Sequence, residues 1–202
     1  MKAYLYSHWA DSCLFMALAL TVMLLSYLPI TPLVLFLIWF QFPVYLVHQF
    51  EEHFYPGHFR EFINKEIFNS PYPDSPLTPS AVFWINTIVI WCLFPLCAVL
   101  AQNISLSFGI LLPVFGLFNA TLHIIMFVVK KRYNPGLIVS AFVNYPTGIY
   151  TLWVLAAEGV MTTTNVSIAL LVTIILHLLI IIMVKFPRAN LSKDVEKADP
   201  VA

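Results

Sequence analysis

The stretch from Ser12 to Phe50 contains no Asp, Glu, Lys or Arg. It belongs to a chain of 202 residues that is 60% hydrophobic and 10% charged, whereas soluble domains carry about 25% charged residues. A helix that spans a bilayer needs about 20 apolar residues. We therefore predict an all-α fold, a six-helix transmembrane bundle in a single domain over residues 1–191, with spans at 13–28, 32–54, 80–101, 106–129, 136–157 and 166–185.

The distribution of basic residues predicts how this bundle is oriented. All 10 Lys and Arg residues lie before the first span or after the second, fourth and sixth. The loops on the opposite side carry none. By the positive-inside rule both termini then face the cytoplasm, and residues 192–202 form a polar cytoplasmic tail. We expect a multi-pass integral membrane protein in contact with membrane lipids, and no nucleic-acid partner.

The only sizeable hydrophilic insertion lies between the second and third spans. Within residues 58–69 a helical period places apolar side chains on one face, namely Phe59, Phe62, Ile63 and Ile67. The opposite face carries Arg60, Glu61, Asn64 and Lys65. This pattern is typical of an amphipathic helix that lies in the membrane interface. Such a helix can serve as a lid over a site, or simply as a tether between two spans.

Residues 48–53, with the sequence His-Gln-Phe-Glu-Glu-His, place four ionisable side chains at the end of the second span. One charge at the centre of a membrane helix costs roughly 2.5–3.5 kcal/mol, so the cluster requires mutual pairing, water or a metal ion. At about 100° per helical residue, Glu51 and Glu52 lie on either side of His48. His53 points away from this stripe, and we expect it to reach the lipid headgroups.

Further polar side chains occur at a similar depth in the other spans: Asn86, Asn119, His123, Asn144 and His177. We predict that the metal ligands are His48, Glu51, Glu52 and His123. One of the two carboxylates, Glu51 or Glu52, would act as a catalytic base toward a metal-bound water. Contacts to substrate or to the ligands are expected from Asn86, Asn119, Asn144, His177 and His53.

A mixed His/Glu set suits zinc or iron, so we expect a divalent ion of one of these metals. Two metal-free interpretations stay open, an acid/base or proton-handling cluster and a structural polar network.

The His48-x-x-Glu51-Glu52 run in a small polytopic protein resembles the HXXEE family, which is named for that motif. The pair Asn119 and His123 and the turn at residues 133–136 (Tyr-Asn-Pro-Gly) also look like this family. The likeness extends from about residue 42 to residue 150. It implies His48, Glu51 and Glu52 as the defining residues, and it implies no particular activity.

These features favour an integral membrane metalloenzyme that acts on a lipid or another hydrophobic small molecule at the cytoplasmic leaflet. Zinc would indicate hydrolysis, and iron would indicate oxidation. One alternative is a transporter for a metal ion or for protons. Another is a structural or assembly subunit of a larger membrane complex, in which the polar cluster only serves packing.

Overall fold

The computed structural model describes residues 2–198, with side chains described from residue 4 to residue 184. Every regular element in that part of the chain is helical. The first half contains α1 (Lys2–His8), η1 (Trp9–Ser12), α2 (Cys13–Tyr27), η2 (Leu28–Ile30), α3 (Leu33–His53), α4 (Phe59–Phe62), η3 (Ile63–Ile67), α5 (Pro79–Asn86) and η4 (Thr87–Leu93). The second half contains α6 (Phe94–Asn103), η5 (Leu106–Ile110), α7 (Leu111–Lys130), α8 (Leu137–Val139), η6 (Ser140–Asn144), α9 (Tyr145–Ala157) and α10 (Thr163–Ala198).

These elements combine into six helices that are long and apolar enough to cross a membrane, which confirms the number of predicted spans. The first candidate span begins at Tyr4 instead of residue 13, because α1 and η1 continue into α2. At the other end α10 stays helical through Ala198, so residues 192–198 of the predicted tail are part of that helix. Residues 199–202 of the tail lie outside the described residues.

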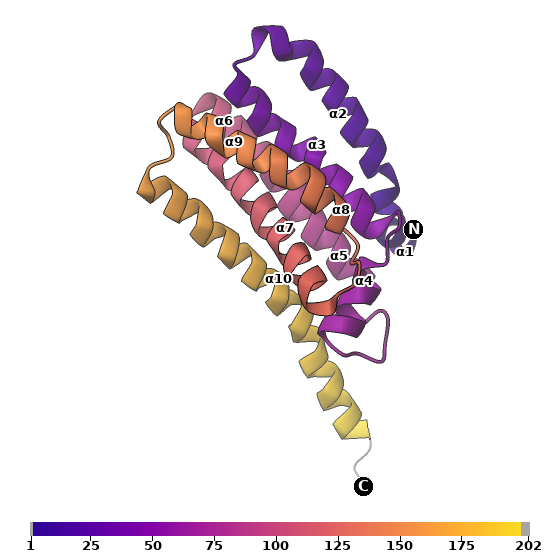
Figure 1. Ribbon diagram of the computed structural model, residues 1–202. Coiled ribbons are helices and arrows are strands. Elements are labelled where there is room, and N and C mark those ends of the chain that lie inside the picture. The colour runs from indigo at the N-terminus through magenta and orange to yellow at the C-terminus, as the bar shows by residue number, and fades with distance from the viewer. Residues whose placement is uncertain (1, 199–202) are drawn as a thin grey trace.

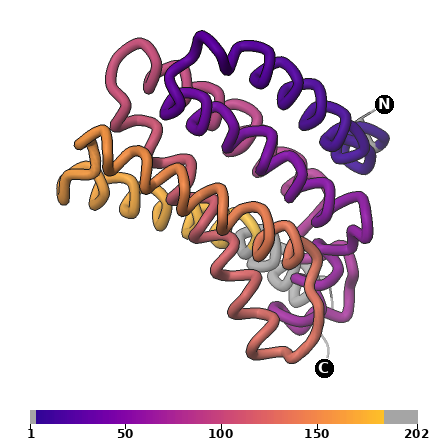
Figure 2. The backbone as a smooth tube through the Cα atoms, turned by 45° about the horizontal axis from the view of Figure 1, so that its top comes forward, coloured from indigo at the N-terminus to yellow at the C-terminus, as the bar shows by residue number. Residues whose placement is uncertain are grey.

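The helix α3 is the central element of the bundle. It packs against α2, α6, α7 and α9. In Figure 1 the helices α2 and α10 lie on opposite flanks, and Figure 2 shows from a second direction that α2 and α3 run side by side. The position of α3 follows from its sequence, because its residues are apolar on nearly every face and many of them are buried.

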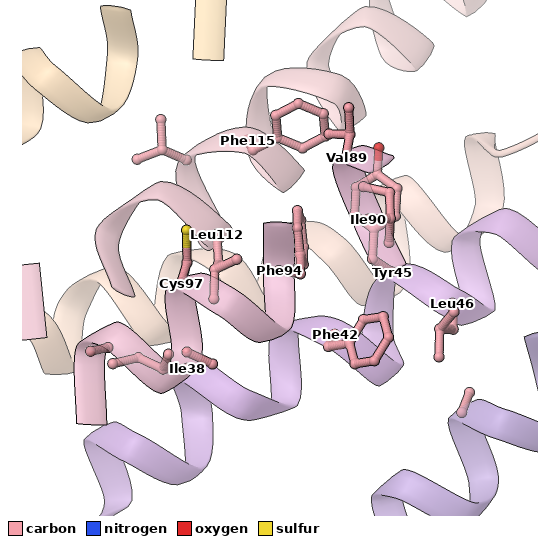
Figure 3. Packing of buried hydrophobic residues seen from close by; sticks show 14 of the residues in the cluster. Ile38, Phe42, Tyr45, Leu46, Val89, Ile90, Phe94, Cys97, Leu112 and Phe115 are labelled. Carbon is pink, nitrogen blue, oxygen red and sulfur yellow. The ribbon is translucent and has the colours of Figure 1, made fainter. Parts of the chain in front are cut away.

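The hydrophobic core lies where α3 meets the helices that follow it (Figure 3). Ile38, Leu46, Ile90 and Leu112 are almost completely buried there. Aromatic rings fill the remaining space, as in the edge-to-face pair of Phe94 and Phe115 at 5.8 Å between ring centroids. This core fixes the relative positions of α3 and α7, the two helices whose polar residues form the site described below.

Two of the spans contain a π-helical turn that ends two residues before a proline. The turn η4 precedes Pro95, and η6 precedes Pro146. Proline has no backbone N–H and its ring clashes with the carbonyl four residues earlier, so the regular α-helical bond cannot form there. Widening to a π-turn relieves this conflict. In η6 the widened turn presents Ser140 and Asn144 as buried residues.

The segment between α3 and α5 forms the short helices α4 and η3, and its interfacial position stays a prediction. One part of the predicted helical pattern is wrong. Asn64 was expected on the polar face, but it is fully buried. Its amide nitrogen donates to the carbonyls of Pro73 and Leu77, at 2.7 and 2.9 Å, and its carbonyl accepts from the N–H of Leu77 at 2.8 Å. A buried loop must satisfy its backbone groups, and Asn64 does so for Leu77.

Candidate metal centre

Three buried side chains converge between α3 and α7. His48 and Glu52 lie one turn apart on α3, and His123 comes from α7. These three residues are called the group below. Each residue offers one ligand atom, and these atoms lie within 4.8 Å of one another. Oε1 of Glu52 lies 3.4 Å from Nε2 of His48 and 3.1 Å from Nε2 of His123. Two ligands about 2.0–2.2 Å from one ion lie roughly 3.0–3.6 Å apart, so these separations fit a shared metal.

The orientation of the His123 ring is fixed by Asn134. The amide nitrogen of Asn134 donates to the backbone carbonyl of His123 at 3.0 Å, so its carbonyl oxygen faces Nδ1 of the ring at 2.7 Å. Nδ1 therefore carries a hydrogen, and Nε2 faces Glu52. A neutral Nε2 has only a lone pair to offer, and two acceptor atoms 3.1 Å apart repel each other. Either a proton or a metal ion must stand between Nε2 and the carboxylate.

His48 is held in a similar way. The amide of Asn119 donates to its Nε2 at 2.9 Å, and the hydroxyl of Ser140 lies 3.4 Å from its Nδ1. Since Nε2 accepts this hydrogen bond, it carries a lone pair, and it lies 3.4 Å from Oε1 of Glu52. A metal ion bound at this nitrogen would replace the Asn119 hydrogen as the partner of that lone pair. Asn119 is thus a neighbour of the group, as the sequence predicts.

Glu51 lies apart from these three residues. Its Oε1 accepts from the Tyr133 hydroxyl at 2.8 Å and from the N–H of Ile138 at 3.0 Å. Its Oε2 accepts from the N–H of Val139 at 2.6 Å. These N–H groups open the helix α8, whose first amides have no partner within the helix. The structure thus places Glu51 as a cap for α8, and not beside His48 and His123 as the predicted ligand set requires.

The hydrogen bond to Glu51 affects the pKa of Tyr133, which lies in the loop between α7 and α8. Burial, together with that bond, raises the pKa of Tyr133 well above its ordinary value. The phenol therefore stays protonated at physiological pH and keeps donating to Glu51. This bond ties the loop of residues 131–136 to α3.

Gly136 closes one side of the group. Its φ of +96° belongs to the left-handed region, which favours glycine. A Cβ atom at this position would lie 2.6 Å from Cε1 of His123 and 2.8 Å from Cε1 of His48. Only a residue without a side chain can bring the backbone this close to both imidazoles. The loop that holds His123 through Asn134 thus also covers the group.

His53 and Asn86 belong to the surroundings of Glu52. Nε2 of His53 lies 3.4 Å from Oε2 of Glu52 and 3.4 Å from the amide of Asn86. The His53 side chain is only 9% exposed and its ring packs against Trp9 at 5.1 Å. The expectation that His53 reaches the headgroups is therefore wrong. Because α1 and η1 extend the first helix, their residues cover the face of α3 that carries His53. The predicted first span, which begins at residue 13, is too short to cover that face.

Gln49 forms a second polar network that the sequence analysis did not anticipate. It is fully buried. Its amide nitrogen donates to Asn86 at 2.8 Å, and its carbonyl accepts from the indole of Trp91 at 3.0 Å and from the thiol of Cys13 at 3.8 Å. The only signal in the sequence was a Gln inside the motif, and glutamines at the end of a span are usually solvated.

The other two predicted residues, Asn144 and His177, do not join the group. Asn144 is buried, and neither atom of its amide has a hydrogen-bond partner among the described residues. His177 lies on α10 between the rings of Phe115 and Phe118, at centroid distances of 4.7 and 4.5 Å. Its Nδ1 donates to the carbonyl of Thr173 at 2.8 Å. It lines the cavity that reaches the group from the membrane side.

That cavity, called the apolar cavity below, has a volume of about 490 Å³. Its walls are mainly aliphatic and aromatic side chains of α5, η4, α7 and α10, among them Ile85, Val89, Leu122 and Ile181. Glu52, His123 and Asn119 lie at one part of its wall. Two of the candidate ligands, Glu52 and His123, are therefore accessible to an apolar molecule of the size that protein pockets commonly bind.

Comparison with known proteins identifies a family. The sequence model of a family described as proteins of unknown function with an HXXEE motif matches residues 39–151. No curated protein and no solved structure matches the chain. The match covers more than half of the 202 residues and includes His48, Glu51, Glu52, His123 and the loop that carries Gly136. The chain belongs to the HXXEE family.

Proposed function

We propose that this protein is an integral membrane metalloenzyme that acts on a lipid or another hydrophobic small molecule. His48, Glu52 and His123 would hold the metal. The observation that carries the proposal is the convergence of two imidazoles and one carboxylate, all buried, with His123 and Glu52 on the wall of the apolar cavity. Buried charges are costly unless they are paired or coordinate a metal. An apolar cavity that ends at such a group favours a role in a reaction over a purely structural role in helix packing.

The surrounding residues support this proposal by what they do to the ligands. Asn134 keeps Nε2 of His123 directed at Glu52, as partners of metal-bound imidazoles commonly do. Gly136 covers the group with backbone, which excludes water from that side. Glu51 positions the loop through α8 and Tyr133, and we assign it this role in place of that of a ligand or a base.

Two histidines and one carboxylate occur in catalytic zinc sites and in non-haem iron sites. Either ion would supply a Lewis acid and lower the pKa of a bound water. We therefore keep zinc and iron as the proposed metals, with hydrolysis and oxidation as the corresponding reactions.

We further propose that the group lies in the cytoplasmic leaflet and that both termini face the cytoplasm. The support is the placement of all 10 basic residues on one side of the spans. Lys130 of α7 and the segment after α3 meet at this end, where the Lys130 amine donates to the carbonyl of Glu66 at 2.8 Å. A C-terminal tag that protease reaches only from outside intact cells would overturn the orientation.

A polar seam between α3 and α9 favours a second candidate, a transporter for a metal ion or for protons. Gln41, two turns before His48 on α3, donates to the hydroxyl of Thr151 at 2.8 Å. Both residues are buried. Asn144, with its unpartnered amide, lies between Ser140 and Thr151 along the chain. Ion flux in liposomes that is lost in Thr151→Val, with metal content unchanged, would support this candidate over the enzyme.

The metal content of the purified protein tests the leading proposal. After expression with added zinc or iron, we expect about one ion per wild-type chain. The variant His123→Gln removes a ligand and should lose the ion. The matched control His58→Gln changes an exposed histidine that is paired only locally with Glu61, at 3.0 Å, and should keep it. A wild-type protein without metal, or equal loss in the control, would contradict the proposal.

A further inference from the structure

A second cavity also reaches Glu52. This polar cavity has a volume of about 240 Å³ and is lined by Tyr6 of α1 and by the segment that follows α3, including Gly57, His58, Arg60 and Glu61. It therefore lies at the end of the bundle that carries basic loops. Glu52, His53, Phe59 and Val82 line both cavities. Two spaces of opposite character thus meet at the candidate ligand Glu52.

The apolar cavity opens sideways, toward the surface that faces the membrane. Three of its lining residues on α7 and α10 remain well exposed, namely Leu122 (38%), Ile125 (50%) and Leu178 (52%). In a chain with these apolar spans, exposed aliphatic side chains of this kind contact lipid tails. A molecule with an apolar chain can therefore enter between α7 and α10 directly from the bilayer.

The charges around the polar cavity are already paired. Arg60 contacts Asp74 at 2.6 Å, and His58 contacts Glu61 at 3.0 Å. An ionic head group would compete with these pairs without gaining a free counter-charge. A neutral head that carries oxygen atoms leaves both pairs undisturbed.

The geometry points to an amphiphile as the ligand of this site, with one apolar chain in the apolar cavity and an uncharged, oxygen-bearing head in the polar cavity. The bond between head and chain then lies beside Glu52. This inference names the substrate class and rests on the proposed function for its chemistry. Binding of the amphiphile depends only on the two cavities, so it can be measured whether or not the protein holds a metal.

The probe is a monopalmitoylglycerol that carries a diazirine near the end of its acyl chain, added to the full protein in nanodiscs. After photolysis, we expect cross-links on cavity-lining residues of α7 and α10. Unlabelled monopalmitoylglycerol should compete with the probe. Hexadecane, which has no head, and lysophosphatidate, whose head is anionic, should compete at least about tenfold less, a difference of about 1.4 kcal/mol. Equal or stronger competition by hexadecane would contradict the inference that the site binds a head group. Equal or stronger competition by lysophosphatidate would contradict the inference that this head is uncharged.

Two matched pairs of variants locate the chain. Ile85 lines the apolar cavity, whereas Ile88 on the same span faces outward with 55% exposure and does not line it. Ile85→Trp should lower specific labelling about tenfold, and Ile88→Trp should leave it unchanged. Ile181→Trp and the outward-facing control Ile182→Trp repeat the comparison on α10, in case Ile85→Trp fails to fold. Unchanged specific labelling in a cavity variant that folds normally would contradict the inference.

The metal content of the same samples separates this inference from the proposed function. Specific labelling in a protein that never holds metal would retain the amphiphile site and overturn the metalloenzyme. A stoichiometric metal ion in a protein without specific labelling would do the opposite.

Discussion

Two polar networks lie on neighbouring faces of α3, and they differ in what they leave unsatisfied. Around Gln49, neutral amide, indole and thiol groups match each donor with an acceptor. Around Glu52, a carboxylate meets imidazole nitrogens whose hydrogens point elsewhere. Gln49 lines neither cavity, whereas Glu52 lines both. The first network is complete without a ligand, and the second needs a proton or a metal ion between its imidazoles and its carboxylate.

The contrast shows how one short motif can serve two purposes. His48 and Glu52, one helical turn apart, face α7 and His123. Gln49 faces the first and third spans, where Cys13 and Trp91 hold it. Glu51 points to a third side and fixes the loop that covers the group. A motif of five residues therefore provides two candidate ligands and the contacts that position them.

The largest expected effect comes from Glu52→Gln, which breaks the group while it preserves the shape of the side chain. Loss of the anionic ligand should weaken metal binding at least about 100-fold, beyond what loss of a supporting residue causes. The helix should still insert, because the substitution removes a charge from an apolar span. Metal titration of the purified variant measures this. Glu61→Gln, an exposed carboxylate, is the control, and equal affinity in the two variants would refute the assignment of Glu52.

Gly136→Ala should have the next largest effect. The new Cβ would meet His123 and His48 and would impose a strained backbone that costs about 1–3 kcal/mol. We expect a lower melting temperature together with weaker metal binding. Gly159→Ala is the matched control, because Gly159 also has a positive φ of +74° but nothing within 4 Å of the added Cβ. If both variants lose the same stability and neither loses metal, Gly136 does not shape the group.

Gln49→Leu tests the other side of the comparison. The variant leaves two half-buried groups, the carbonyl oxygen of Asn86 and the indole N–H of Trp91, without the partner that Gln49 supplies, at a cost of at most about 1–3 kcal/mol. Stability in detergent should fall, whereas metal content should stay at the wild-type level. Loss of metal in a folded Gln49→Leu protein would show that the two networks act as one unit.

The smallest effect is expected for a partly exposed ion pair that contrasts with both networks. Glu66 contacts Arg132 and also Lys130, the latter at 3.8 Å. The bond to Arg132 lowers the pKa of Glu66 below its ordinary value. The pair therefore stabilises the protein above the unfolded carboxyl pKa, and this contribution is lost as pH falls through the lower folded value. Melting temperatures of wild type and Glu66→Gln should converge at acid pH, and a constant difference would contradict this.

The sequence predicts the number of spans and the convergence of His48, Glu52 and His123 because both follow from helical period and depth. The role of Glu51 could not be predicted in this way, since its partners are backbone N–H groups of a helix more than 80 residues away. The closure by Gly136 depends on a loop geometry that no periodicity encodes. His53 was misplaced because the first helix extends further than its apolar run and covers it with Trp9.

The central claim is that His48, Glu52 and His123 bind one metal ion, and X-ray absorption spectroscopy of the zinc-loaded protein tests it most directly. We expect a first shell of nitrogen and oxygen at about 2.0–2.2 Å, with outer-shell scattering from two imidazoles. His123→Gln should remove the scattering of one imidazole or abolish binding, and His58→Gln should change neither. A shell with sulfur ligands, or one without imidazole, would contradict the account.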